Sequence, residues 1–400
     1  MSPAAILRRA SRPRRRGHGT AAAIPARVES AGREPWEGGA LVLLTLFAFS
    51  FGLLELYSAS GFMAQSEGLP SHFYAVRQLS GAAAGVVLAT ALARMDYHRL
   101  QQWAWPLLGI VALMLVIVVL PGTEFIAPRV NGARRWIRLG VTFQPSEFAK
   151  FALVVWTAAL AVKKQDRLHS FTRGLLPFLV VWFGFVLLVF LQPNMSAALL
   201  LVLLAALVLF AGGARIGHFI LLGVFAVPVV WRQIQGASYR WNRIVAFLDP
   251  TADPEGVSYQ IRQALIAVGS GGLHGRGFGQ SQQKFGFLPE PHNDFLFAMI
   301  GEEWGWLGVV LVLALFAGFG WVGYRIADRA PDQFGCLLAL GMSNLLVVSA
   351  LLHMGVALAL LPTTGVSLPF MSYGRSALLV AFVAVGVLLS VARAGRAGVR

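Results

Sequence analysis

The decapeptide Phe285-Gly-Phe-Leu-Pro-Glu-Pro-His-Asn-Asp294 leads directly into an apolar run over residues 295–324. The decapeptide carries two carboxylates, a histidine and two prolines, whereas the run is long enough to cross a bilayer. Ionisable groups at such a boundary are costly to desolvate, and in membrane proteins they mark functional sites. The stretch therefore predicts a water-facing, functional loop that meets a transmembrane helix.

The whole chain has the composition of a membrane protein. Of its 400 residues, 57% are hydrophobic and 13% charged, and the mean hydropathy is +0.67. Long runs with almost no charge predict an all-α polytopic membrane protein with about ten transmembrane helices. These runs cover residues 39–59, 76–93, 103–121, 147–162, 175–191, 196–211, 216–231, 295–324, 335–360 and 373–392.

Three regions follow from this pattern. Residues 1–38 form a basic tail with eight arginines, which we expect to be disordered and cytoplasmic. Residues 39–393 form the membrane domain, with a large extracytoplasmic loop, 232–294, between the seventh and eighth spans. Within that loop, residues 259–268 have the pattern of a short amphipathic helix, which we expect to fold back onto the membrane domain. Residues 394–400 form a short cytoplasmic tail.

The distribution of basic residues predicts the topology. With both termini in the cytoplasm, the inside segments hold 20 lysines and arginines and the outside segments hold 12. Nearly all the outside ones lie in three loops, 122–146, 232–294 and 361–376. Such clusters indicate an anionic ligand on the outer face, with contacts to lipid headgroups as the alternative. The single cysteine excludes a disulfide within one chain.

The opening decapeptide supplies the candidate catalytic groups. Asp294 is a candidate general base held at the membrane edge, where apolar surroundings raise a carboxylate's pKa; its alternative role is the N-cap of the following helix. Glu290 is a candidate to orient Asp294, hold a metal or contact a sugar. His292 is a candidate to hydrogen-bond sugar or phosphate, with a local structural partner as the alternative.

Other candidates lie in the basic loops. Arg134 and Arg135 are placed to reach phosphates, and so are Arg276 and Lys284 beside the glycine cluster 269–279. That cluster lacks the strand–turn–helix context of a nucleotide-binding motif, so it predicts a flexible loop.

The segment Leu361-Pro-Thr-Thr-Gly-Val-Ser-Leu-Pro-Phe-Met-Ser-Tyr-Gly-Arg-Ser376 predicts irregular backbone at membrane depth, which persists only where it lines a cavity. Its Ser372, Tyr373 and Arg375 are candidate substrate contacts. Glu302 and Glu303, inside the eighth span, are expected to be structural or to line a groove, and Lys150 is expected to pair with Glu147 or with one of them.

Three sets of motifs together resemble a known family. They are Asn131-Gly-Ala-Arg-Arg-Trp with Phe143-Gln-Pro-Ser-Glu-Phe-Ala-Lys150, Phe247-Leu-Asp-Pro250 through Leu288-Pro-Glu-Pro-His-Asn-Asp294, and Leu361-Pro-Thr-Thr-Gly365 through Ser372-Tyr-Gly374. The chain is similar to the SEDS family (shape, elongation, division and sporulation) of lipid II glycosyltransferases. The resemblance covers essentially the whole membrane domain and is stronger to the division branch, FtsW, than to the elongation branch, RodA.

The resemblance implies a function. We expect an inverting peptidoglycan glycosyltransferase that polymerises lipid II on the outer face of the cytoplasmic membrane, with polyprenyl diphosphate as leaving group and Asp294 as general base. Glu290 and Lys284 map onto motif positions beside it. A divalent cation, Mg or Mn, would help to neutralise the diphosphate, with Asp294 as a candidate metal ligand. No organic cofactor is expected.

The resemblance also implies partners and a location. These are lipid II, a class B penicillin-binding protein transpeptidase, other division proteins and the membrane at the division septum, but no nucleic acid. The alternatives are a lipid II flippase, an elongation-type polymerase and a non-catalytic scaffold. The chain departs from the family pattern at Asn194, Asn293, His353, Thr364 and Arg375. Arg375 adds a charge near Thr364, where division members often carry lysine.

Overall fold

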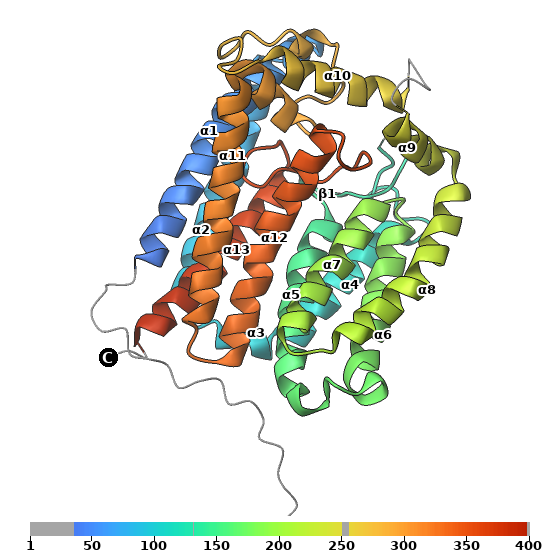
Figure 1. Ribbon diagram of the computed structural model, residues 1–400, viewed down its shortest axis with the longest axis vertical. Coiled ribbons are helices and arrows are strands. Elements are labelled where there is room, and N and C mark those ends of the chain that lie inside the picture. Colours follow the sequence, from blue (N-terminus) through green and yellow to red (C-terminus); the bar gives the residue numbers. More distant parts are fainter. Residues whose placement is uncertain (1–35, 131, 250–255, 398–400) are drawn as a thin grey trace, which may run out of the picture. The chain divides into compact units, whose positions relative to one another are not determined.

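Long apolar helices run through the chain (Figure 1), whose computed structural model describes residues 36–130, 132–249 and 256–397. Each predicted span corresponds to one of them: α1 (Glu37–Ser66), α2 (Phe73–Arg94), α4 (Ala104–Val119), α5 (Pro145–Lys163), α6 (Leu176–Phe190), α7 (Met195–Ala211), α8 (Ile216–Gln235), α11 (Leu296–Asp328), α12 (Gln333–Ala357) and α13 (Arg375–Ala397). Within the described ranges, eight candidate spans are long and apolar enough to cross a membrane, and α4 and α7 are shorter apolar helices. The predicted fold class is confirmed.

Short elements connect these helices. They are α3 (His98–Gln102), α9 (Ser238–Leu248), α10 (Val257–Ser270), the 3-10 turns Gln165–Arg167 and Gln283–Phe285, the π-helical turn Phe171–Leu175, and the strands β1 (Ile137–Leu139) and β2 (Val141–Phe143). α10 contains the helix predicted at 259–268. It lies across one end of the long helices and packs against α11, so this part of the loop folds back as expected (Figure 1).

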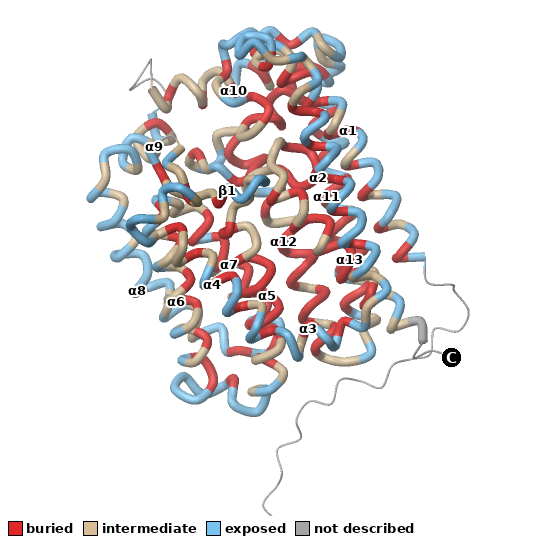
Figure 2. The backbone as a smooth tube through the Cα atoms, turned by 180° about the vertical axis from the view of Figure 1, so that it is seen from behind, coloured by how far each residue is buried: buried red, intermediate tan, exposed pale blue. Residues whose placement is uncertain are grey.

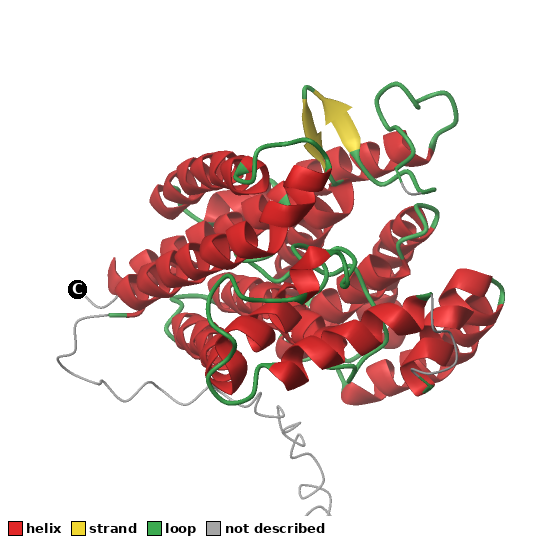
Figure 3. Cartoon of the chain, turned by 90° about the horizontal axis from the view of Figure 1, so that it is seen from above, coloured by secondary structure: helices red, strands yellow, loops and turns green. Residues whose placement is uncertain are grey.

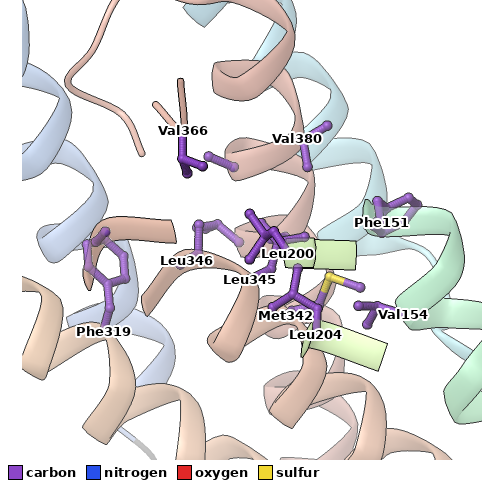
Figure 4. Close-up of a cluster of buried hydrophobic side chains, with 14 of the residues drawn as sticks. Phe151, Val154, Leu200, Leu204, Phe319, Met342, Leu345, Leu346, Val366 and Val380 are labelled. Carbon is purple, nitrogen blue, oxygen red and sulfur yellow. The ribbon is translucent and has the colours of Figure 1, made fainter. Parts of the chain in front are cut away.

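The core lies between α5, α7 and α12. Figure 4 shows its side chains meeting from all three helices, and they are apolar throughout: Phe151 and Val154 of α5, Leu200 and Leu204 of α7, and Met342, Leu345 and Leu346 of α12. Figure 2 shows the contrast with the periphery, where α8 is exposed or half-buried along its length and has no buried residue. An exposed apolar helix is stable here because lipid solvates its side chains.

Glycines allow α2 and α13 to pack closely. A Cβ at Gly85 of α2 would lie 2.5 Å from the Phe382 ring of α13, and a Cβ at Gly386 of α13 would lie 2.6 Å from the Ala89 carbonyl oxygen. Larger side chains at these positions would separate the two helices. Small residues at helix contacts are how membrane helices gain packing energy, because lipid removes the hydrophobic driving force between them.

α11 is broken at Gly305, whose φ of 65° and ψ of −154° lie outside the helical region. The break frees backbone groups that a continuous helix would use, and the glycine-rich loop, defined here as residues 271–282, takes them up. The amides of Arg276 and Gly277 donate to the carbonyls of Glu302 and Glu303, both at 3.0 Å. In the other direction, the Trp306 amide donates to the Gly272 carbonyl at 2.9 Å. The sequence predicted a flexible loop. The structure instead pairs the loop to the helix through these hydrogen bonds.

The side chains of Glu302 and Glu303 complete this junction. Both are 1% exposed, and the Glu303 carboxylate accepts from the Ser58 hydroxyl at 2.6 Å and the Gly279 amide at 2.8 Å. Glu302 accepts from the hydroxyl of Ser281 and the amide of Gln282 and pairs with Arg276. The structural role expected for these carboxylates agrees with this geometry. Lys150 pairs with Glu147 at 2.6 Å, as expected from their spacing on one helix.

Some sequence expectations fall at the edge of the described residues. Most of the predicted tail, 1–38, lies outside them, as do 250–255 and 398–400. α1 already begins at Glu37, and α13 continues to Ala397, so residues 394–397 are helical.

Replacing Gly305 by alanine is expected to destabilise the protein. The new Cβ would lie 2.4 Å from the Gly275 nitrogen, on a backbone conformation that L side chains rarely adopt. We expect a loss of about 1–3 kcal/mol from backbone strain alone, with a further loss if the loop detaches. Thermal unfolding of the purified protein in detergent measures this. Gly184→Ala in α6 is the matched control, because no atom lies within 4 Å of its Cβ position; equal unfolding temperatures for the two variants would contradict the account.

Candidate active site

A cleft of about 760 Å³ opens at the end of the bundle where α5 begins. Its walls come from the β-hairpin and the loop before it, the starts of α5 and α7, the end of α8, the first half of α9 and the turn 290–294. Segment 361–377 completes them, with irregular backbone up to the start of α13 at Arg375. The predicted cavity-lining role of segment 361–376 therefore agrees with the structure. Basic residues line the cleft from several sides: Arg77, Arg135, Arg138, Arg240, Arg243 and Arg375.

The β-hairpin made by β1 and β2 (Figure 3) contributes Arg138 to the lining of the cleft. β1 and β2 are antiparallel, and Gly140 with a φ of 74° makes the tight turn between them. Their register sets Arg138 directly opposite Thr142, and both residues line the cleft. The Asn-Gly turn predicted upstream agrees with the paired backbones of Val130 and Ala133, although Asn131 itself is not described.

Two arginines are held in place by backbone carbonyls. Arg135 donates from Nε to Gln192 at 3.2 Å and from Nη2 to Pro193 at 2.6 Å, at the end of α6. Arg243 of α9 donates from Nη1 to Thr363 at 3.1 Å. These carbonyl groups are uncharged and do not neutralise a guanidinium. Both arginines therefore keep their positive charge at the cleft. Partial burial, then the charge of Arg243, lowers the pKa of Arg135, but an arginine stays protonated at any physiological pH.

Asp294 lies on the cleft wall, immediately before α11. The N-cap of that helix is Phe295, so the alternative role of Asp294 as N-cap is wrong. A Cβ built on Gly365 would lie 3.8 Å from both carboxylate oxygens, which places this carboxylate against segment 361–377. The pKa of Asp294 is raised to about 6, first by burial and then by the charge of Glu290, while the charges of Arg243 and Arg135 oppose the shift.

Glu290 begins the turn that carries Asp294. Its backbone has a φ of 51°, a left-handed conformation that is strained for a residue other than glycine. Its carbonyl accepts from the amides of Asn293 and Asp294, at 3.1 and 3.2 Å, which closes the turn. The side chain lines the cleft and is only partly covered by protein. This partial burial raises the pKa of the Glu290 carboxyl group, whereas a hydrogen bond from the Asn293 side chain lowers it. Asn293 therefore supports Glu290, although threonine is usual at this position.

The structure brings only part of the predicted set of site residues to the cleft. Arg135, Glu290, Asp294, Tyr373 and Arg375 line it, and Arg134, Arg276, Lys284, His292 and Ser372 are absent from its lining.

The residues outside the lining have partners of their own. Arg134 pairs with Glu124 at 2.9 Å, and Arg276 pairs with Glu302 at 3.4 Å. Lys284 donates to the carbonyl of Gly279, and the Ser372 hydroxyl accepts from the Leu368 amide at 3.1 Å. These contacts stabilise loops around the cleft.

His292 is also outside the lining, although it is two residues from Asp294. It is 3% exposed, and burial lowers its pKa to about 4, so it is neutral at physiological pH. Its ring packs against the rings of Tyr74 and Tyr373.

The other departures from the family pattern lie on or near the cleft. Asn194 lines it and caps α7, since its side-chain oxygen accepts from the Ala197 amide at 3.3 Å. Thr364 and Arg375 both line it. His353 is buried in α12, with Nδ1 2.8 Å from the Val366 carbonyl oxygen.

Sequence reasoning did not single out several residues that line the cleft: Arg77, Arg138, Gln144, Tyr239, Arg240 and Arg243. The arginines among them were noticed only as part of the excess charge predicted outside. Their convergence depends on how α2, α9 and the hairpin pack, which no local pattern records.

Metal binding remains a prediction. Within the described ranges, no group of three or more His, Cys, Asp or Glu residues is arranged to hold a metal ion. Mg²⁺ is often bound by one or two carboxylates together with substrate phosphates. Asp294 and Glu290, both on the cleft wall, fit such a site only once a phosphorylated substrate has supplied further oxygens.

Known proteins resemble this chain over nearly its whole length. The "Cell cycle protein" family, FtsW/RodA/SpoVE, matches residues 39–397. "Stage V sporulation protein E" of Bacillus subtilis (strain 168) is 40% identical over 357 residues, which are 89% of this chain and 97% of that protein. A "Probable peptidoglycan glycosyltransferase FtsW" of Trichlorobacter lovleyi is 42% identical over 352 residues, which are 88% and 92% of the two chains.

Solved structures agree. A chain from the structure "Structural coordination of polymerization and crosslinking by a peptidoglycan synthase complex" has a TM-score of 0.71 at 27% identity, covering 89% of this chain and 97% of that one. The rod shape determining protein RodA of Thermus thermophilus has a TM-score of 0.64 at 29% identity, covering 88% and 95%. These matches span the helices that build the cleft, and they confirm the predicted SEDS resemblance. The chain belongs to the FtsW/RodA/SpoVE family of cell cycle proteins.

Proposed function

We propose that this protein is a peptidoglycan glycosyltransferase that polymerises lipid II during cell division, with Asp294 as general base. One observation carries the proposal: a carboxylate with a pKa of about 6 lies in the wall of a cleft lined by arginines. Both substrates of such a polymerase are sugars linked to a lipid diphosphate, so the reaction needs a base and positive charge in one place. The names of the FtsW relatives support the activity.

The reaction follows from these groups. Asp294 takes the proton from the 4-hydroxyl of one lipid-linked disaccharide as its oxygen bonds to the anomeric carbon of the growing strand. The bond from that carbon to the diphosphate oxygen breaks on the opposite face, its electron pair stays with the diphosphate, and the configuration inverts. Arg135 and Arg243 stabilise the charge that develops there. Glu290 makes Asp294 a stronger base through its negative charge. A divalent cation on the two carboxylates and the diphosphate would supply additional positive charge.

Location and partners follow from the same reaction. The cleft faces the outside of the cytoplasmic membrane at the division septum, and both termini are cytoplasmic. A class B penicillin-binding protein cross-links the new strands. The relative described as part of a peptidoglycan synthase complex, in which polymerisation and cross-linking are coordinated, supports such a partner.

A lipid II flippase is the alternative function. A flippase needs a polar path through the membrane, whereas the interior between α5, α7 and α12 is filled by apolar side chains (Figure 4). The arginines and carboxylates that line the cleft lie instead at one end of these helices. The geometry therefore favours chemistry at one face over transport.

Asp294→Asn is expected to abolish polymerisation of lipid II by the purified protein with its penicillin-binding protein partner. Loss of a general base costs about 10²–10⁴-fold in rate. The products are separated by size on gels. Asp166→Asn, an exposed aspartate beyond the far end of α5, is the control and should keep wild-type activity. An inert wild type would remove the enzymatic proposal, and an active Asp294→Asn would remove only the role of Asp294.

The rate is expected to fall as the pH drops through about 6. Asp294 acts as a base only when ionised, and its pKa is raised to about 6, so activity should be full above about pH 7 and decline about tenfold per unit in acid. Glu290→Gln removes a charge that raises this pKa, so the midpoint of the pH–rate profile should move to lower pH.

Rates measured with EDTA and with Mg²⁺ also test for a metal, because a cation on the carboxylate would lower the midpoint of the pH–rate profile. A profile flat from pH 5 to 8 in EDTA would contradict the assignment.

Arg135→Ala and Arg243→Ala are expected to weaken binding of a short polyprenyl diphosphate by about tenfold each, because each removes a charge-assisted contact. Titration calorimetry in detergent measures the affinity. Arg134→Ala is the matched control: it is the neighbouring arginine, but it pairs with Glu124 and lies outside the lining. Equal losses for Arg134→Ala and Arg135→Ala would contradict the assignment of the cleft.

A further inference from the structure

Three aromatic rings pack together beside the cleft, those of Tyr74, His292 and Tyr373. The ring centroid of His292 lies 4.8 Å from that of Tyr74 and 5.7 Å from that of Tyr373. The two tyrosine rings meet edge to face, 5.0 Å apart. Such tilted and edge-to-face arrangements are the favourable geometries for aromatic pairs. We name these three side chains the aromatic bracket.

The ring nitrogens of His292 make no hydrogen bonds to described residues. Nδ1 is buried without a partner. Nε2 lies 3.9 Å from the nearest carboxylate oxygen of Glu290, which is beyond hydrogen-bond distance. His292 also does not line the cleft. The contribution of this side chain therefore comes from the shape and area of its ring.

The bracket joins three parts of the chain that are far apart in sequence. Tyr74 belongs to α2, Tyr373 to segment 361–377, and His292 to the turn that ends in Asp294. A backbone contact strengthens the join, because the Tyr373 amide donates to the His292 carbonyl at 3.0 Å. α2 holds the same segment a second time, since Gln78 donates to the Ser372 carbonyl at 2.9 Å and accepts from the Gly374 amide at 3.4 Å.

The turn between Glu290 and Asp294 needs such support. It contains one residue in a left-handed conformation, and the two backbone hydrogen bonds that close it share a single acceptor, the Glu290 carbonyl. The bracket packs against the middle of this turn, whereas both carboxylates project into the cleft. Removing the ring would leave a space on the buried side, into which the turn could relax and carry Asp294 away from the substrate.

We propose that His292 is a positioning residue, whose ring in the aromatic bracket holds the Asp294 carboxylate in register with the cleft. This inference rests on the proposed function and adds a specific device to it. It replaces the expectation that His292 hydrogen-bonds sugar or phosphate. The role requires a flat aromatic ring and does not require a ring nitrogen.

Two substitutions separate these roles. His292→Phe keeps the ring and removes the nitrogens, so kcat for lipid II polymerisation should stay within about threefold of wild type, given that the nitrogens are unused. His292→Ala removes the ring, so kcat should fall by about 10²-fold, the cost of a misplacement of about 1 Å, with KM little changed. A His292→Phe enzyme as inactive as His292→Ala, or a loss that falls mainly on KM, would overturn the proposal.

A second measurement does not depend on activity. Amide hydrogen exchange of the apo protein should show faster exchange in peptides covering 286–295 for His292→Ala and wild-type protection for His292→Phe. Equal protection in all three proteins would overturn the positioning role. If the wild type fails to polymerise lipid II, the proposed function fails, while this exchange pattern still decides whether the bracket holds the turn.

The exchange experiment also covers a variant that does not fold. If His292→Ala yields no folded protein, His292→Leu takes its place, because it fills the volume without a flat ring. Faster exchange at 286–295 with His292→Leu than with His292→Phe supports the proposal, and identical exchange refutes it. A Tyr74→Ala variant, which removes the opposite side of the bracket, should speed exchange in the same peptides.

Discussion

The requirement that every backbone polar group find a partner at membrane depth controls this structure. Hydrocarbon offers no hydrogen bonds, so a broken helix is stable only where protein satisfies the freed groups. α11 is broken at Gly305, and the glycine-rich loop supplies both donors and acceptors to the break. The carboxylates of Glu302 and Glu303 bind further amides and hydroxyls of the same loop. These contacts fix the first part of α11, which begins two residues after Asp294, to the glycine-rich loop.

The same constraint explains how a cleft with so many arginines is stable. Isolated charges repel one another and are costly to bury, but Arg135 and Arg243 are each anchored by backbone carbonyls at the ends of other elements. Carbonyl oxygens stabilise a guanidinium without cancelling its charge. The cleft therefore carries positive charge with few carboxylates near it, and an anionic substrate would supply the missing negative charge.

The sequence predicted what depends on local pattern. Ten apolar runs predicted ten long helices, and the pattern at 259–268 predicted α10, because hydrophobicity and helix period are local properties. Asp294 and Glu290 stood out for a similar reason, as charges at a membrane boundary. The sequence also predicted that positive charge gathers in three loops, and all three supply cleft arginines, among them Arg135, Arg243 and Arg375. It did not predict that Arg134 pairs with Glu124 while Arg135 lines the cleft, or that His292 packs against two tyrosines. Those outcomes depend on contacts between residues far apart in the chain. The local sequence around each residue does not predict such contacts.

The close packing of α2 against α13 has a consequence for biosynthesis. Chains are made from the N-terminus, and α13 is the last of the described helices to be synthesised. Segment 372–374, which leads into α13, is held by Gln78 of α2, almost 300 residues earlier. This part of the cleft wall therefore cannot assemble until the chain has been synthesised past residue 374. A nascent chain that ends before residue 372 would already contain Asp294, yet the cleft wall beside that residue would be incomplete.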